Sequence, residues 1–157
     1  MQTASTDIAN RAIGIIDQFK GKEGPLLPIL HELQDEFGYV PPETLPLIAH
    51  ALNISRAEVH GVFTFYHDYR DHPAGRHVLK LCRAEACQSM GSDALADRAR
   101  QLLGIDWHGT TADGAVTFEP VYCLGLCACA PAAMLDGDVI GRLDAEQLEE
   151  IAAEVRL

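Results

Sequence analysis

Hydrophobic positions in the first half of the chain recur every three to four residues, the period of a helix with one buried face. Gly38 ends the second such stretch, and Pro41-Pro42 opens the third. The fourth follows Ser55, which with Glu58 has the spacing of a capping box. We therefore expect a small bundle of four short helices over residues 1–75. The apolar positions that define it are Ile8, Ala12, Ile15, Ile16 and Phe19; Leu26, Leu27, Leu30, Leu33 and Phe37; Leu45, Ile48 and Leu52; and Val59, Val62 and Phe63.

The pattern changes after Pro73 and Gly75, and β-prone runs appear. The sequence predicts a second domain over residues 76–157 with the order β-α-β-β-β-α, an α/β sandwich with a mixed sheet. Its elements are strands at His77–Leu81 and Val116–Tyr122, a helix at Ser92–Leu103, a hairpin of Ala133–Leu135 and Asp138–Gly141 turning at Asp136-Gly137, and a last helix after a second capping box, Asp144 to Gln147.

Composition narrows the classes of function. The chain has 157 residues, 48% of them hydrophobic, and a formal net charge of −11. Acidic residues outnumber basic ones in both halves, so the surface should repel nucleic acid phosphates and attract a basic partner. The first residues do not have the pattern of a signal peptide, and no apolar run reaches membrane-spanning length. We expect a cytoplasmic protein that neither binds nucleic acid nor inserts into a membrane.

Four of the five cysteines form two pairs, each at the end of a predicted strand. Cys82 and Cys87 have C-x4-C spacing, and Cys123 and Cys127 have C-x3-C spacing. In a reducing compartment such cysteines are metal ligands or reactive thiols more often than disulfides. A [2Fe–2S] cluster needs two thiolates on each of its irons, which two loops of two cysteines can supply. Gly125 would let backbone N–H groups approach the sulfur atoms.

Other uses of these cysteines fit the pattern less well. A structural zinc site with four cysteine ligands is compatible with the spacing, although zinc favours tighter C-x2-C knuckles. A thiol–disulfide enzyme would carry C-x-x-C before a helix, which is absent. The fifth cysteine, Cys129, is interpreted as a half-buried apolar thiol, with a substitute for Cys127 as the alternative. The spacing favours iron–sulfur and leaves zinc open.

The cysteine motifs resemble a known family. Residues 82–88 (Cys-Arg-Ala-Glu-Ala-Cys-Gln) and 123–127 (Cys-Leu-Gly-Leu-Cys), the latter followed by Ala-Pro, resemble the thioredoxin-like [2Fe–2S] subunits. These include the 24 kDa-type subunit of the NADH dehydrogenase module of complex I and subunits of NAD-reducing hydrogenases and NAD-dependent formate dehydrogenases. Phe-Gly-Tyr-Val-Pro (37–41) and Gly-Val-Phe-Thr-Phe-Tyr (61–66) match as well. The resemblance implies a thioredoxin-like ferredoxin domain preceded by a helical bundle, with a [2Fe–2S] cluster on Cys82, Cys87, Cys123 and Cys127.

The resemblance also implies a function without bond-making chemistry in this chain. The cluster would exchange electrons with a partner subunit that carries FMN and a [4Fe–4S] cluster, within a complex that has a larger catalytic subunit. Arg-Ala-Glu-Ala followed by Gln88 looks most like the gamma subunit of formate dehydrogenase, with the complex I or hydrogenase subunit as the alternative. A free-standing ferredoxin shuttle is a rival of another class. Arg83 is interpreted as a solvated charge that could also ease reduction of the cluster.

Overall fold

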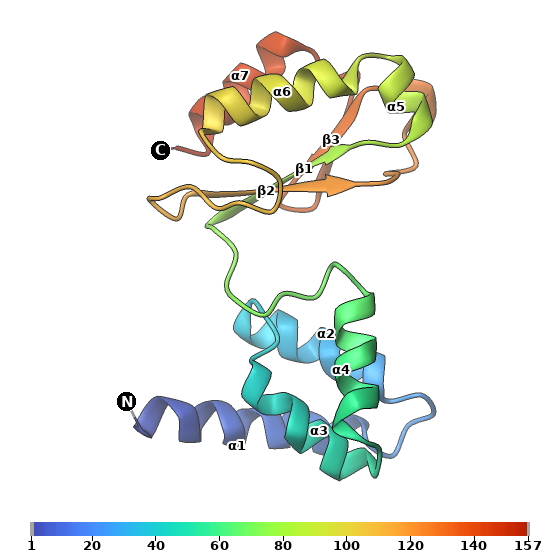
Figure 1. Cartoon of the computed structure of the whole chain (residues 1–157), viewed down its shortest axis with the longest axis vertical. Coiled ribbons are helices and arrows are strands. Elements are labelled where there is room, and N and C mark those ends of the chain that lie inside the picture. The colour runs from blue at the N-terminus through green and yellow to red at the C-terminus, as the bar shows by residue number, and fades with distance from the viewer. Residues whose placement is uncertain (1, 157) are drawn as a thin grey trace. The chain divides into compact units, whose positions relative to one another are not determined.

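The computed structural model describes residues 2–156, with side chains described from Thr6 onward. It divides between Pro73 and Ala74 into two compact units, called here the helical unit and the sheet unit (Figure 1). Within the described residues, no helix has the length and apolar character needed to cross a membrane.

The helical unit contains the four predicted helices, α1 (Gln2–Phe19), α2 (Leu26–Phe37), α3 (Leu45–Leu52) and α4 (Arg56–Phe65). A 3₁₀ turn, η1 (Pro42–Thr44), leads into α3. Gly38 ends α2 in the left-handed conformation, and the Ser55–Glu58 capping box is formed at the start of α4. The inner positions of the predicted apolar stripes make one core, whose buried members include Ala12, Ile16, Leu30, Leu33, Ile48, Val59 and Phe63.

The sheet unit has four strands in the order β2-β1-β3-β4: β1 (His77–Cys82), β2 (Val116–Val121), β3 (Ala132–Leu135) and β4 (Asp138–Gly141). β1 pairs in parallel with β2 and antiparallel with β3, and β3 pairs antiparallel with β4. The predicted mixed sheet is therefore confirmed. The hairpin turns at Asp136 and Gly137 with φ of 52° and 98°, and a positive φ at both central positions is what a type I′ turn requires.

Helices α6 (Ser92–Leu103) and α7 (Ala145–Glu154) lie together over one face of the sheet (Figure 1). The second predicted capping box is formed at the start of α7, by Asp144 and Gln147. Between sheet and helices lies an apolar core that includes Leu79, Leu81, Ala99, Leu103, Val116, Phe118, Leu148 and Ile151.

Two short helices were not predicted. These are α5 (Glu85–Ser89), inside the first cysteine loop, and the 3₁₀ helix η2 (Cys127–Cys129), at the end of the second. Both are shorter than two turns, so hydrophobic periodicity could not reveal them.

Candidate metal centre

The topology of the sheet brings the two cysteine loops together. β1 and β2 are parallel neighbours, with Cys82 in register with Val121. Parallel strands end at the same edge of a sheet, so the loops that leave β1 and β2 begin side by side. The Arg83 N–H donates to the Val121 carbonyl at 2.8 Å and extends this pairing into the first loop.

The first pair of thiols is buried. Cys82 is the last residue of β1, and Cys87 lies in α5; each is 2% exposed. The two thiols are within hydrogen-bonding reach of each other, and the backbone N–H of Ala132, at the start of β3, donates to Cys87. Cys82, Cys87 and Ala132 form a small buried cluster of their own at this edge. This half of the site is shielded from water.

The second pair is exposed. Cys123 and Cys127 lie in the loop after β2, and their Sγ atoms are 3.7 Å apart. The N–H of Gly125 donates to Cys123 Sγ at 3.3 Å. Gly125 makes this bond with φ of +77°, a conformation that glycine adopts without strain. The predicted role of Gly125, to bring a backbone N–H to sulfur, is confirmed.

The thiols influence one another's protonation. Burial raises the pKa of the Cys87 thiol, and the hydrogen bond with Cys82 raises it further. The Gly125 N–H lowers the pKa of Cys123, whereas the hydrogen bond with Cys123 raises the pKa of Cys127. The charge of Cys127 also acts on Cys87 across the two loops. Four neighbouring thiolates need a nearby positive charge, and bound metal ions supply it while releasing the protons.

The spacing of the exposed pair suits tetrahedral metal. Two thiolates bound to one tetrahedral ion at about 2.3 Å lie roughly 3.8 Å apart, close to the separation of Cys123 and Cys127. Within residues 2–156, no three Cys, His, Asp or Glu side chains gather as a site for a single ion. The thiols lie instead as one buried pair and one exposed pair. Two pairs, one for each iron, are the arrangement that a [2Fe–2S] cluster uses, so the residues present fit this group.

Cys129 stands apart from the four thiols in its contacts. It closes η2, where its N–H donates to the Leu126 carbonyl at 2.8 Å and its own carbonyl accepts from Arg142 at 2.6 Å. Its Cβ packs against the backbone of β4, since a Cβ added at Gly141 would come within 3.0 Å of it. Cys129 is half-buried, as expected, and its contacts attach the second loop to the end of the sheet.

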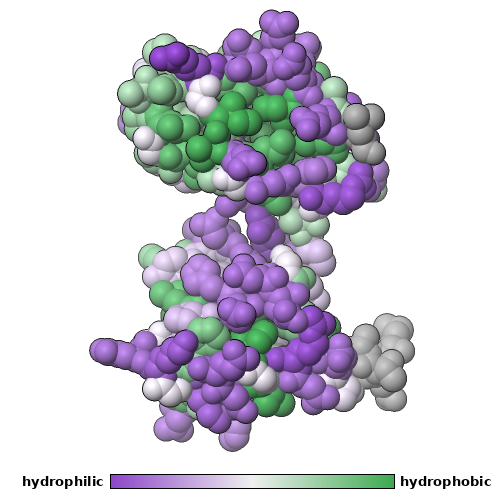
Figure 2. Space-filling view, turned by 180° about the vertical axis from the view of Figure 1, so that it is seen from behind, coloured by the Kyte–Doolittle hydropathy of each residue, from purple (hydrophilic) through white to green (hydrophobic). Residues whose placement is uncertain are grey.

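The surface around the exposed pair is partly apolar. Tyr122, next to Cys123, is 70% exposed, and Met90, which follows α5, is 61% exposed. Leu124 and Leu126 are half-buried against the Cys82–Cys87 cluster. Seen from behind, the sheet unit presents a continuous hydrophobic area (Figure 2). The edge that carries the cysteines therefore combines open thiols with apolar side chains.

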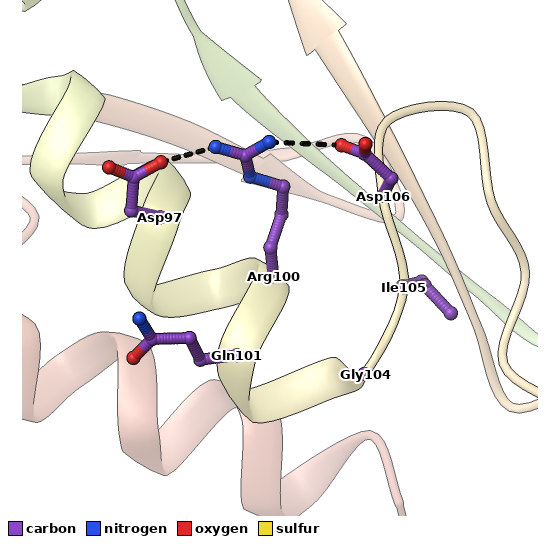
Figure 3. A pocket seen from close by; sticks show the side chains of 6 residues that line it. All are labelled: Asp97, Arg100, Gln101, Gly104, Ile105 and Asp106. Carbon is purple, nitrogen blue, oxygen red and sulfur yellow. Dashed lines mark hydrogen bonds and ion pairs between the residues drawn. The ribbon is translucent and has the colours of Figure 1, made fainter.

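A second hollow in the sheet unit has different chemistry. It lies where α6 ends and has a volume of about 460 Å³ (Figure 3). Arg100 occupies it and is paired with Asp97 and, at 3.2 Å, with Asp106. The two carboxylates neutralise the only cation among the described residues that line it. This network fastens the loop after α6 to the helix and offers no ligand for iron.

Comparison with known proteins gives a family and several relatives. The profile described as thioredoxin-like [2Fe-2S] ferredoxin matches residues 12–156. A protein of NADH-quinone oxidoreductase from Mycobacterium tuberculosis is 34% identical over 142 residues, which cover 90% of this chain and 56% of that protein. NADP-reducing hydrogenase subunit HndA of Solidesulfovibrio fructosivorans is 32% identical over 142 residues, 90% of this chain and 83% of that protein.

A solved structure supports the fold alone. A chain of the crystal structure of NAD+-reducing [NiFe]-hydrogenase in the H2-reduced state superposes with a TM-score of 0.69 at 23% identity. The superposition covers 81% of this chain and 22% of that one. The chain thus spans little more than half of the mycobacterial relative and a small part of the solved hydrogenase chain.

Proposed function

The chain belongs to the thioredoxin-like [2Fe–2S] ferredoxin family, and we propose that it is the electron-transfer subunit of an NAD-linked oxidoreductase of the NADH-quinone oxidoreductase or NAD-reducing hydrogenase type. The observation that carries this proposal is the meeting of two cysteine pairs at one edge of the sheet, with Cys123 and Cys127 at the separation that a tetrahedral iron requires. The cofactor of the family is a [2Fe–2S] cluster, and these residues fit it.

Each pair has its own part in the proposal. Cys82 and Cys87 would hold one iron in the buried half, and Cys123 and Cys127 the other in the exposed half. When bound, the cluster takes up and returns one electron at a time. The N–H groups of Ala132 and Gly125 donate to Cys87 and Cys123, and such bonds stabilise charge on sulfur and so favour the reduced state. The apolar surroundings of the buried pair oppose added negative charge, and the balance sets the potential.

The proposed partner is an NADH-binding subunit with FMN and a [4Fe–4S] cluster, in a complex that also has a larger catalytic subunit. The open side of the site supports this arrangement, because Cys123 and Cys127 are exposed beside the apolar Tyr122. Contact on that side would shorten the path for the electron and remove apolar surface from water. The net charge of −11 favours a partner surface with basic groups, and we propose that the complex is cytoplasmic.

The relatives favour one class of complex over another. The sequence of the first cysteine loop resembles formate dehydrogenase gamma subunits, but the relatives described above belong to NADH-quinone oxidoreductase and hydrogenase. They support the alternative prediction better than formate dehydrogenase, which none of these relatives supports. The helical unit argues against a free-standing shuttle, because an electron carrier needs no second unit of that size.

The test is to purify the tagged chain from its own host at low salt and assay the complex that elutes with it. We expect NADH oxidation with an artificial acceptor, or hydrogen-dependent NAD reduction, in a fraction that contains FMN. Formate-dependent NAD reduction with molybdenum or tungsten present would overturn this choice of complex in favour of formate dehydrogenase. Elution as a small single chain would instead indicate a shuttle. A Cys123→Ser/Cys127→Ser chain, purified in parallel, controls for contacts that do not need the loaded site.

A further inference from the structure

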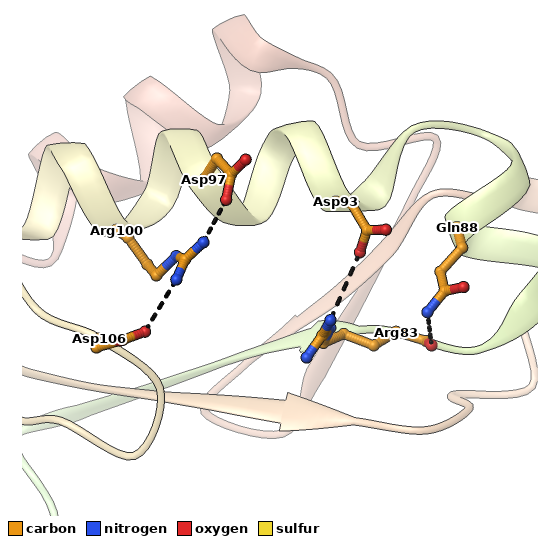
Figure 4. A network of polar contacts seen from close by, with 6 residues as sticks. All are labelled: Arg83, Gln88, Asp93, Asp97, Arg100 and Asp106. Atoms are coloured by element: carbon orange, nitrogen blue, oxygen red, sulfur yellow. Dashed lines mark hydrogen bonds and ion pairs between the residues drawn. The ribbon is translucent and has the colours of Figure 1, made fainter.

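Arg83 is held rigidly beside the first cysteine. It follows Cys82 directly, and its backbone is fixed on both sides: its N–H donates to Val121, and its carbonyl accepts from Gln88 Nε2 at 3.0 Å. Figure 4 shows the side chain running under α6 toward Asp93, while Gln88 reaches the backbone at the other end of the residue. The cation is therefore fixed at its base rather than free to swing in solvent.

The guanidinium group is also fixed at its far end. It faces the ring of Trp107, with 5.2 Å from Cζ to the ring centroid, and its Nη2 is 3.8 Å from Asp93. Trp107 in turn stacks on the buried Phe118, with 4.3 Å between ring centroids. Arg83 Nε is buried and has no hydrogen-bond partner within the described residues. A cation that gives up a hydrogen bond and part of its hydration is costly as pure structure, which points to a use for its charge.

From this arrangement we propose that Arg83 and Asp93 form an opposed pair of charges that tunes the reduction potential of the site, with Arg83 favouring the reduced state. The inference rests on the proposed function, because it presumes a cluster on the four cysteines. Four thiolates already give the oxidised cluster a net negative charge, and reduction adds one electron to it. A fixed cation nearby stabilises the more negative state, and a nearby anion destabilises it.

The two charges should therefore act with opposite sign. In Arg83→Gln the midpoint potential should become more negative, and in Asp93→Asn it should become more positive. At a fixed solution potential we expect the ratio of reduced to oxidised cluster to fall in Arg83→Gln by on the order of threefold to tenfold, about 30–60 mV for a one-electron couple. The Asp93 side chain is 61% exposed against 35% for Arg83, so solvent should make its shift the smaller one.

The experiment is a redox titration of the full chain with reconstituted cluster, followed by visible absorption and by EPR of the reduced state at low and high salt. Arg83→Lys keeps the charge and should restore most of the wild-type potential. Arg76→Gln is the matched control: it removes the same charge from the opposite end of β1, roughly 20 Å along the strand, and should shift nothing. Unchanged EPR line shape in each variant would show that the cluster itself is intact.

Opposite shifts in Arg83→Gln and Asp93→Asn, with Arg83→Lys near wild type, would support the inference. Shifts of the same sign, no shifts, or an equal shift in Arg76→Gln would overturn it and leave the network a structural one. If Arg83→Gln fails to assemble a cluster, Asp93→Asn and Arg83→Lys still decide. A wild-type chain that takes up no cluster would contradict the proposed function itself, an outcome distinct from a cluster whose potential ignores these charges.

Discussion

Replacement of Gly125 by alanine should loosen the exposed half of the site without touching a cysteine. Gly125 has φ of +77°, and its N–H reaches Cys123 Sγ at 3.3 Å. A Cβ added there meets no atom within 4 Å, so the whole penalty comes from the backbone conformation. For an L-residue other than Asn or Asp that penalty is about 1–2 kcal/mol.

The expected consequence is faster loss of the cluster. A destabilisation of about 1–2 kcal/mol raises the population of the opened loop roughly fivefold to thirtyfold. Where opening and closing are fast, the rate at which a chelator removes iron follows that population. Bleaching of the visible absorption of the loaded chain by an excess of iron chelator should therefore accelerate in Gly125→Ala by about the same factor.

Two variants make the result decisive. Gly125→Asn should bleach more slowly than Gly125→Ala, because asparagine tolerates the left-handed conformation better. Gly24→Ala is the matched control: Gly24 has φ of +58° and equally open surroundings, but it lies between α1 and α2 in the helical unit. Bleaching of Gly125→Ala at the wild-type rate, or equal acceleration in Gly24→Ala, would refute the role given to the Gly125 backbone.

Three further predictions concern the two units and the fifth cysteine. Ser55→Ala should lower the stability of the helical unit by about 1 kcal/mol in urea unfolding, because it removes the N-cap of α4. In the same box, the Ser55 backbone N–H and hydroxyl lower the pKa of Glu58, so this contribution is complete above the ordinary carboxyl pKa of 4.5 and should fade as the pH falls below it; in Glu58→Gln that part of the acid sensitivity should be missing from a pH series of unfolding curves. Leu81→Ala should cost about 2–5 kcal/mol in the sheet unit, since Leu81 is 1% exposed in its core; a loss under about 1 kcal/mol would contradict the packing described. Cys129→Ser should keep the full iron content and visible spectrum, since four other thiols complete two tetrahedra, and a loss of half the iron would make Cys129 a ligand.

Much of the fold could be predicted because its local signals agree. The Ser55–Glu58 and Asp144–Gln147 capping boxes, the Asp136-Gly137 turn and the helix end at Gly38 each depend on neighbouring residues alone, and all are formed. The meeting of the cysteine loops followed from topology, since a helix between two strands favours a parallel pair.

Other features depend on contacts that no local pattern encodes. The donor to Cys87 is the backbone N–H of Ala132, and any residue but proline could provide it. The position of Trp107 over Arg83 depends on a loop that folds back on Phe118, whose carbonyl accepts from the His108 N–H at 2.7 Å. The unequal exposure of the two cysteine pairs likewise depends on how α5 packs, and α5 is too short to show periodicity.

The most direct test of the account is to measure the iron and acid-labile sulfide of the full chain after anaerobic reconstitution, with EPR of the dithionite-reduced sample. The account predicts two irons and two sulfides per chain and one unpaired electron per reduced cluster, with the signal altered or lost when any of Cys82, Cys87, Cys123 or Cys127 is changed to serine. One zinc ion per chain without sulfide, or a cluster unaffected by loss of one of these cysteines, would contradict it.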